Sequence, residues 1–155
     1  DNDTTGTTMK LVDIIKAWTE DSTIDNVELD TESLRIPNLH AKYLAIRSEH
    51  SLKLKALYIQ RKQLVRDLSE YYRGEKNNPQ ELREIGKEPW ELKTLKSDLL
   101  SYVEADDLMM NIEKKIAMEK EIVGVVDEIM RAVNNRGFQI QAAIKWRALS
   151  QFGLS

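Results

Sequence analysis

The stretch IEKKIAMEKEIVGVVDEIMRAV, residues 112–133, decides the fold class. Its apolar positions alternate four and three residues apart, which is the spacing of a coiled-coil seam on one face of a helix. A single long helix is therefore expected from about residue 105 to residue 134. Its predicted seam, in which Glu119 is the polar member, consists of Ile112, Ile116, Glu119, Val123, Val126, Met130 and Val133.

A second long helix is predicted from Pro37 to Tyr72, because this stretch holds no Gly and no further Pro. Pro37 suits the first turn of a helix, and the mixed, acidic residues 19–36 before it are expected to form turns or extended chain. At about 1.5 Å per residue the helix would be about 54 Å long, more than a small domain buries alone. Its apolar positions are Leu39, Tyr43, Ile46, Leu54, Leu57, Leu64, Leu68 and Tyr71.

Shorter helical patterns flank these two stretches. Residues 9–18 place apolar residues on one face at spacings of three and four. Pro89 is expected to open a helix that runs to about residue 102. Its inward side chains would be Trp90, Leu92, Leu95 and Leu99, whereas Ile140, Ile144, Trp146 and Leu149 would pack from a helix over residues 138–152.

The segment NNRGF, residues 134–138, has two interpretations. Asn and Gly tolerate left-handed backbone angles, so the segment is predicted to stop the long helix. Alternatively, it forms a loop that contacts a partner through Arg136.

Four segments follow from these patterns. Residues 1–8 are expected to be a disordered leader or an expression remnant, with Met9 as the native start. Residues 9–74 form an N-terminal helical region with a long basic helix, and the polar residues 75–89 form a linker. Residues 90–155 form a C-terminal helical region for oligomerisation. The predicted fold is all-α, with long helices in a helical hairpin or open bundle of coiled-coil character.

The apolar stripes are longer than a monomer readily shields, so a homo-oligomer is expected. The apolar residues near the C-terminus, including Phe152, favour an interface there. The residues assigned to oligomerisation are Ile112, Ile116, Val123, Val126, Met130, Phe138, Ile144, Trp146 and Leu149.

Composition narrows the function classes. The chain has 155 residues, of which 41% are hydrophobic and 32% charged, and it has no cysteine, which excludes disulfides and Cys-based zinc sites. No stretch approaches 18 uncharged apolar residues, so no membrane span is expected. The net charge of −3 means that a nucleic-acid site must be a local patch.

Catalytic and cofactor motifs are missing from the sequence. It has no phosphate-binding glycine loop, and its two histidines, His40 and His50, lack metal-site spacing. Asp106 and Asp107 are explained by an acidic helix start, which the helix dipole favours. We therefore expect no enzyme, no catalytic residue, no cofactor and no metal.

One basic stretch has the composition of a binding site. Residues 47–73 hold seven Lys or Arg against three Asp or Glu, a net charge of +4 (7 − 3). Cations bind phosphates, and tyrosine rings stack on unpaired bases, so the mixture favours single-stranded nucleic acid. The alternative is a solvated helix face with Tyr71 in the apolar stripe. The candidate residues for binding single-stranded DNA are Arg61, Lys62, Arg66, Arg73, Tyr58, Tyr71 and Tyr72.

The order of three segments resembles the UvsY family of bacteriophage recombination mediators, related to those of T4-like phages. The segments are IDNVELDTESLRIPNLHAKYL (24–44), QLVRDLSEYYRG (63–74) and NNRGFQIQAAIKWRAL (134–149). In the family's Lys-x-Arg motif before the Tyr-Tyr pair, Arg66 takes the place of the Lys and Leu68 that of the Arg. The resemblance covers nearly the whole chain, least well over residues 75–89.

This resemblance implies a ring-like homo-oligomer of about six or seven subunits, assembled through the C-terminal region. It implies binding of single-stranded DNA and contacts with a phage recombinase and a phage single-strand-binding protein. The mediator would help the recombinase onto DNA that the other protein covers, in the host cell cytoplasm during infection, for recombination and DNA repair. The competing hypothesis is a non-catalytic coiled-coil structural or virion-assembly adaptor without DNA binding.

Overall fold

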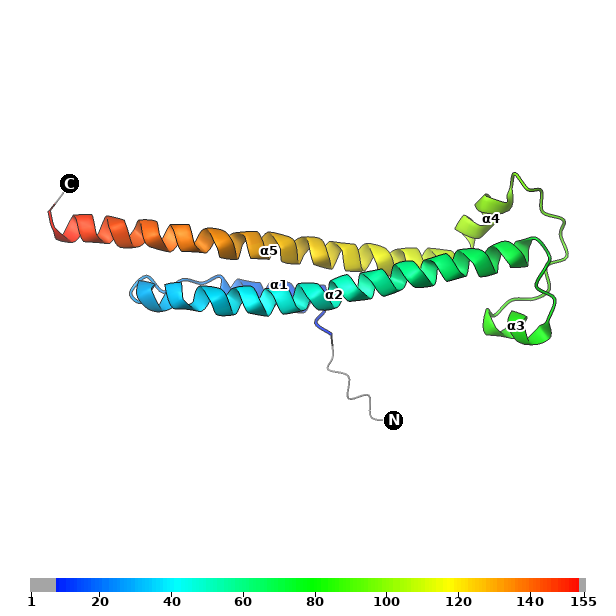
Figure 1. Ribbon diagram of the computed structural model, residues 1–155, viewed down its shortest axis with the longest axis horizontal. Coiled ribbons are helices and arrows are strands. Elements are labelled where there is room, and N and C mark those ends of the chain that lie inside the picture. The colour runs from blue at the N-terminus through cyan, green and yellow to red at the C-terminus, as the bar shows by residue number, and fades with distance from the viewer. Residues whose placement is uncertain (1–7, 154–155) are drawn as a thin grey trace, which may run out of the picture. The chain divides into compact units, whose positions relative to one another are not determined.

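The computed structural model describes residues 8–153, which form five helices and no β-strand. The predicted all-α fold is thereby confirmed, whereas the prediction for residues 1–8 lies, except for Thr8, outside the described residues. In each of the two hydrophobic cores, a part of α2 packs against a part of α5, and Figure 1 shows these parts running in opposite directions, as in a helical hairpin. The helices are α1 (Leu11–Asp21), α2 (Leu29–Tyr72), α3 (Pro79–Glu84), α4 (Leu99–Ala105) and α5 (Asp107–Gln151).

The chain divides into two compact units, and the boundaries fall inside the long helices. Unit 1 contains the described residues up to Leu52 and those from Glu121 onward, and unit 2 runs from Lys53 to Lys120. Each unit therefore has its own part of α2 and of α5. The division at residues 75–89 rests on composition and stays a prediction.

The core of unit 1 joins α1 to the antiparallel pair. Tyr43 of α2 is fully buried, and its ring meets Trp18 edge to face with the centroids 5.6 Å apart. The Tyr43 hydroxyl donates to Asp21 Oδ2 at 2.8 Å, which fixes the end of α1. The remaining core consists of Ile14, Leu39, Ile46, Ile122, Val126, Ile129 and Val133.

The segment NNRGF does not stop a helix, and that prediction was wrong. Helix α5 continues through Gly137 to Gln151. The reason is Arg136, which is 2% exposed and forms an ion pair with Glu32 of α2 at 3.0 Å. It also donates to the carbonyl oxygens of Asp21 (2.8 Å) and Thr23 (2.9 Å), so it ties the α1–α2 connection to α5.

The core of unit 2 contains an aromatic cluster. Tyr72 packs edge to face on Trp90, with ring centroids 4.8 Å apart, and Tyr71 and Tyr102 complete the group. The buried carboxylate of Asp106 accepts a hydrogen bond from the Tyr72 hydroxyl and forms an ion pair with Lys87, each at 2.6 Å. These contacts fold the connection between α2 and α5 back onto α2.

Two further element predictions were wrong. Helix α2 begins at Leu29, so Pro37 lies inside it rather than in its first turn. Asp30 and Glu32 occupy that first turn, where the helix dipole favours acidic side chains. The predicted linker contains α3, which Asn78 caps by accepting a hydrogen bond from the Gln80 backbone N–H.

The segment after Pro89 is the second case. Residues 89–98 are not helical, and α4 begins only at Leu99. Trp90 and Leu99 pack against the core, whereas Leu92 and Leu95 are exposed.

Candidate nucleic-acid interface

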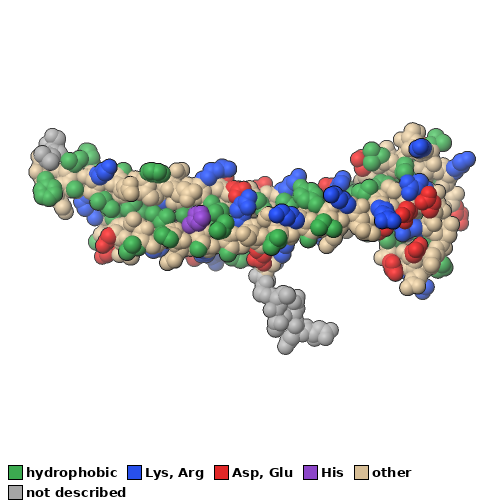
Figure 2. All heavy atoms as spheres, viewed as in Figure 1, with side chains coloured by type: hydrophobic (Ala, Val, Ile, Leu, Met, Phe, Trp, Pro, Cys, Tyr) green, Lys and Arg blue, Asp and Glu red, His purple; other side chains and the backbone are tan. Residues whose placement is uncertain are grey.

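The basic face lies on the part of α2 that belongs to unit 2. Residues 53–66 contain five Lys or Arg and no Asp or Glu, a net charge of +5. Because these residues form an unbroken helix, Tyr58, Lys62 and Arg66 follow one another at intervals of four and share a side of it. All three are exposed. Figure 2 shows Lys and Arg side chains spread along the surface of the long helices.

Three of the four predicted cations form ion pairs on the surface. Such pairs between exposed groups contribute little to stability, so phosphates can replace the carboxylates at small cost. Lys62 is exposed on the same stretch. The pairs are Arg61 with Glu113 of α5, Arg66 with Glu70 (3.4 Å) and Arg73 with Glu75 (3.1 Å).

Glu70 is held in its charged form by its neighbours. Partial burial acts to raise its pKa, but hydrogen bonds from Arg66 and Lys76 bring the pKa below its ordinary value. The carboxylate therefore reduces the positive charge at the Tyr71 end of the basic face.

The three predicted tyrosines lie in different environments. Tyr58 is 38% exposed, whereas Tyr71 and Tyr72 are 5% and 7% exposed and belong to the core of unit 2. The Tyr71 hydroxyl donates to the Glu88 carbonyl oxygen at 2.6 Å. Burial raises the pKa of both core tyrosines, and in Tyr72 the hydrogen bond to Asp106 adds to the rise. The rings of these two residues therefore support the end of the basic helix from within.

Leu68 is fully buried, which explains why a cation is absent at this position. It belongs to the same core as Tyr71 and Val103. A charged side chain here would need to leave this core, so Leu68 is a packing residue in this chain.

Sequence reasoning missed the lysines of α5. Its unit 2 part carries Lys114, Lys115 and Lys120, and Lys120 Nζ lies 5.7 Å from the centroid of the Tyr58 ring. These lysines alternate with Glu113 and Glu119, so the local sequence shows no excess of charge. Only the antiparallel pairing of α5 with α2 shows which of these lysines lies beside the basic face. A groove of about 270 Å³ is lined by Lys53, Ala56, Leu57, Gln60, Lys115 and Glu119.

The residues predicted for oligomerisation fall into two groups. Ile112, Ile116 and Val126 are buried inside their own units, and Val123 and Met130 are half-buried beside the more deeply buried Ile122 and Ile129. The second group is exposed to different degrees. The exposed fractions are 74% for Phe138, 42% for Ile144, 74% for Trp146 and 44% for Leu149.

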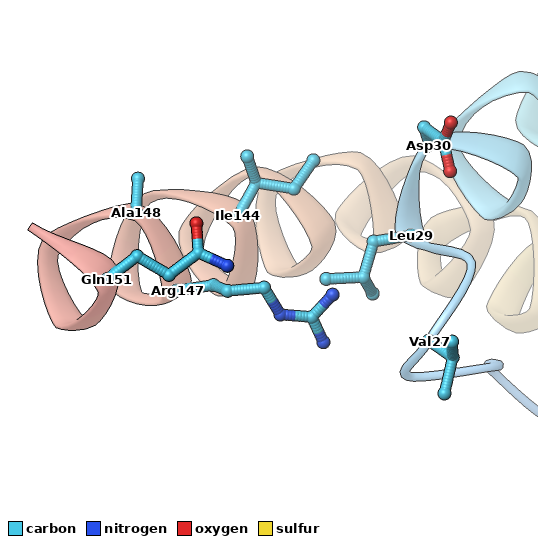
Figure 3. A pocket seen from close by; sticks show the side chains of 7 residues that line it. All are labelled: Val27, Leu29, Asp30, Ile144, Arg147, Ala148 and Gln151. Atoms are coloured by element: carbon cyan, nitrogen blue, oxygen red, sulfur yellow. The ribbon is translucent and has the colours of Figure 1, made fainter.

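A groove of about 290 Å³ borders the second group in unit 1 (Figure 3). In this view, Ile144, Arg147 and Gln151 project from the last turns of α5, across from Leu29. The Arg147 guanidinium donates a hydrogen bond to the Asn26 carbonyl oxygen and so links the last turns of α5 to the connection between α1 and α2.

Metal and membrane features are missing from the described part of the chain. Residues 8–153 contain no group of three side chains placed to hold a metal ion. His50 is buried, with Nε2 3.0 Å from the Met9 carbonyl oxygen, and His40 is half-buried. Among the described helices, none has the length and apolar character that crossing a membrane requires.

These features define a class of protein: a small all-α helical hairpin with a basic, partly aromatic face on one long helix. The chain belongs to the UvsY family, because the profile of that family, "Recombination, repair and ssDNA binding protein UvsY", matches residues 17–152. Recombination, repair and binding of single-stranded DNA are the roles by which this family is described. A search of curated protein sequences gave no match.

Solved structures agree with this assignment at the level of the fold. One crystal structure of the bacteriophage T4 recombination mediator protein UvsY has a TM-score of 0.79 at 21% identity, covering 92% of this chain and 98% of that one. Another crystal form of the same protein gives a TM-score of 0.80 at 19% identity, and the match covers 91% of this chain and 99% of that one. A third crystal form gives a TM-score of 0.78 at 20% identity, and the match covers 89% of this chain and 98% of that one.

Proposed function

We propose that this chain is a recombination mediator that binds single-stranded DNA and helps load a phage recombinase onto DNA covered by single-strand-binding protein. It acts without catalysing a reaction, in the host cytoplasm during phage infection. The observation that carries the proposal is the net charge of +5 over residues 53–66, on one continuous helix, in a chain of net charge −3.

The interface proposed for DNA consists of Arg61, Lys62, Arg66 and Arg73 together with Tyr58. Each phosphate that these cations neutralise releases counterions, so binding should weaken steeply with salt. Tyr58 offers a ring to an unpaired base, which a duplex does not present. Tyr71 and Tyr72 take no direct part in this interface, because their rings are in the core of unit 2.

Assembly supplies the strength that one copy lacks. The C-terminal part of α5 carries a second apolar row, Phe138, Ala142 and Leu149, with Lys145 between Ala142 and Leu149, and Phe152 follows directly after the helix ends at Gln151. Its steps of four and three residues match a coiled-coil seam. Phe138 and Phe152 are 74% and 78% exposed, so this row faces away from the core of unit 1. We infer that a second copy covers it in a ring-like homo-oligomer.

A ring would join several basic faces in one particle. Weak contacts that are linked in this way bind a strand tightly, because each further contact forms within the same complex. When the ring holds a DNA strand, the single-strand-binding protein already on that strand is bound less firmly. The strand then becomes accessible to the recombinase.

Fluorescence anisotropy with a labelled oligothymidine at two or more salt concentrations tests the proposal. The double variant Lys62→Ala/Arg66→Ala should bind more weakly, and its slope of log affinity against log salt should be smaller by about 1.4, at about 0.7 per phosphate. Arg131→Ala is the matched control, because Arg131 is also exposed and paired within its helix, with Glu128. Equal slopes in the wild type and the double variant would reject this interface.

The same titration separates the competing function. A structural or virion-assembly adaptor would form the oligomer but would show no affinity for oligothymidine at low salt. Static light scattering on the same samples reports whether the oligomer is intact.

A further inference from the structure

We propose that Tyr58 of α2 and Lys120 of α5 together form one nucleotide subsite, in which the ring stacks on an unpaired base and the ammonium group neutralises the adjoining phosphate. This inference rests on the proposed function and deepens it, because it extends the DNA interface from one helix to two. It assigns a DNA contact to α5, whose lysines are interspersed with glutamates in the sequence and therefore give no local excess of positive charge.

The geometry of the pair is the first argument. Lys120 Nζ lies 5.7 Å from the centroid of the Tyr58 ring, so a positive charge and an aromatic face occur at one place on the surface. A nucleotide presents the complementary pair of groups, a planar base and a phosphate. Tyr58 as a residue remains 38% exposed beside the lysine, so its side chain is accessible to a base.

The position of the pair is the second argument. Tyr58 stands at the start of the row that continues with Lys62 and Arg66 at steps of one helical turn. A strand that follows these cations along α2 therefore reaches the Tyr58 ring. Lys120 places a further cation at this end of the row, at no cost to the core because its side chain is exposed.

Among the described residues, the two glutamates that precede Lys120 on α5 have other neighbours. Glu113 of α5 pairs with Arg61. Glu119 lines the groove that also contains Lys53 and Lys115. Positions 115 and 120 are about 140° apart on an α-helix, so the groove and the Tyr58–Lys120 pair lie on different sides of α5.

An exposed cation–π contact is weaker than stacking on a nucleobase, so a base can compete with Lys120 for the ring. The ammonium group then remains close enough to meet the phosphate of the same nucleotide. The lysine thus holds the ring in place before binding and contributes charge after it.

The test uses the full chain and three variants, Tyr58→Leu, Tyr58→Phe and Lys120→Gln, with Arg131→Gln as the control at an exposed cation of the same helix. The probes are a labelled oligothymidine and an oligomer of the same length whose sugars carry no base. Lys120→Gln should reduce the salt slope by about 0.7, as the loss of one phosphate contact requires. Arg131→Gln should leave the slope unchanged.

Tyr58→Leu should lower the affinity for oligothymidine about fivefold or more. Its affinity for the abasic oligomer should stay that of the wild type, whereas Tyr58→Phe should retain both affinities. Combining Tyr58→Leu with Lys120→Gln should cost less than the product of the two single losses, because the groups serve one nucleotide.

Two results would overturn the subsite while leaving the proposed function intact. They are an unchanged salt slope in Lys120→Gln, or equal losses on both probes in Tyr58→Leu, in a protein whose Lys62→Ala/Arg66→Ala variant does lose binding. Failure of the wild-type chain to bind oligothymidine at all would overturn both proposals. Circular dichroism of each variant shows whether the helices are intact.

Discussion

Arg136 of α5 and Glu32 of α2 form a buried ion pair, with Nη2 and Oε2 3.0 Å apart and a separation of 104 positions in the sequence. Burial acts to raise the pKa of Glu32, but the hydrogen bonds from Arg136 and Arg35 bring it below its ordinary value. The pair joins three elements, because Arg136 also holds the carbonyl oxygens of the α1–α2 connection.

Replacing Arg136 should therefore destabilise unit 1. Arg136→Ala leaves the Glu32 carboxylate buried without its main partner, and breaking a buried pair in this way costs about 3 kcal/mol or more. Urea denaturation followed by circular dichroism measures the loss. Arg131→Ala, on the exposed face of the same helix, should change the free energy of unfolding by less than about 0.5 kcal/mol. Similar losses in both variants would show that the buried pair has no special role.

Acid should weaken unit 2 through Asp106. Burial acts to raise the pKa of Asp106, but Lys87, Tyr72 and the Leu108 backbone N–H lower it below its ordinary value. A carboxyl group with a lowered folded pKa stabilises the protein above its unfolded pKa, and this contribution is lost as the pH falls through the folded pKa. The free energy of unfolding should thus fall from about pH 5 downwards.

The variant Asp106→Asn isolates this effect. It should be less stable at pH 7 by about 1–3 kcal/mol, because Lys87 loses its charged partner. It should also lose less stability than the wild type between pH 6 and pH 3. Urea denaturation at these two pH values gives the difference, and identical pH dependence in the two proteins would exclude Asp106 as the titrating group.

Two glycines should respond to the same substitution with opposite signs. Gly124 lies inside α5 with open space around an added Cβ atom, so Gly124→Ala should stabilise the helix by about 0.5–1 kcal/mol. Gly74 ends α2 with φ +77°, a backbone angle that a side chain opposes, so Gly74→Ala should destabilise by about 1 kcal/mol. Thermal denaturation of both variants tests the pair, and stabilisation by Gly74→Ala would contradict the structure.

The exposed row near the C-terminus should control assembly. Phe138→Glu and Leu149→Glu place charge on the inferred seam, so multi-angle light scattering should show a smaller particle than the wild type. The helix content should be unchanged, because both side chains face away from the core of unit 1. Ser150→Glu, at an exposed polar position about 120° from Phe138 around the helix, is the control. A wild-type chain that is monomeric at all concentrations would contradict the proposed ring.

The long helices were predictable because three-four spacing is a local property of the sequence. The end of α5 was not predictable, since Asn and Gly favour a stop locally whereas Arg136 finds its partner far away on α2. The interior position of Pro37 was missed for a similar reason. Its expected place in the first turn followed a local preference, but Leu29 and Glu32 are buried upstream and extend the helix.

The candidate interface was predictable in part. A run of cations without acidic residues is visible in composition, and so is the presence of tyrosines. Composition does not distinguish the exposed Tyr58 from the buried Tyr72, whose environment depends on Trp90 and Asp106 from later in the chain. The contribution of Lys120 depends on which residues of α5 lie opposite α2, and only the folded pairing provides this.

Helices α2 and α5 each supply side chains to both hydrophobic cores. Deletion mapping, the usual way to assign binding activities to pieces of a protein, is therefore unsuited to this one. A cut at either boundary severs a helix and exposes apolar surface in both fragments, so a truncated chain that fails to bind has lost its fold as well as its contacts. Point substitutions on the exposed faces are the appropriate tool for separating DNA binding from assembly.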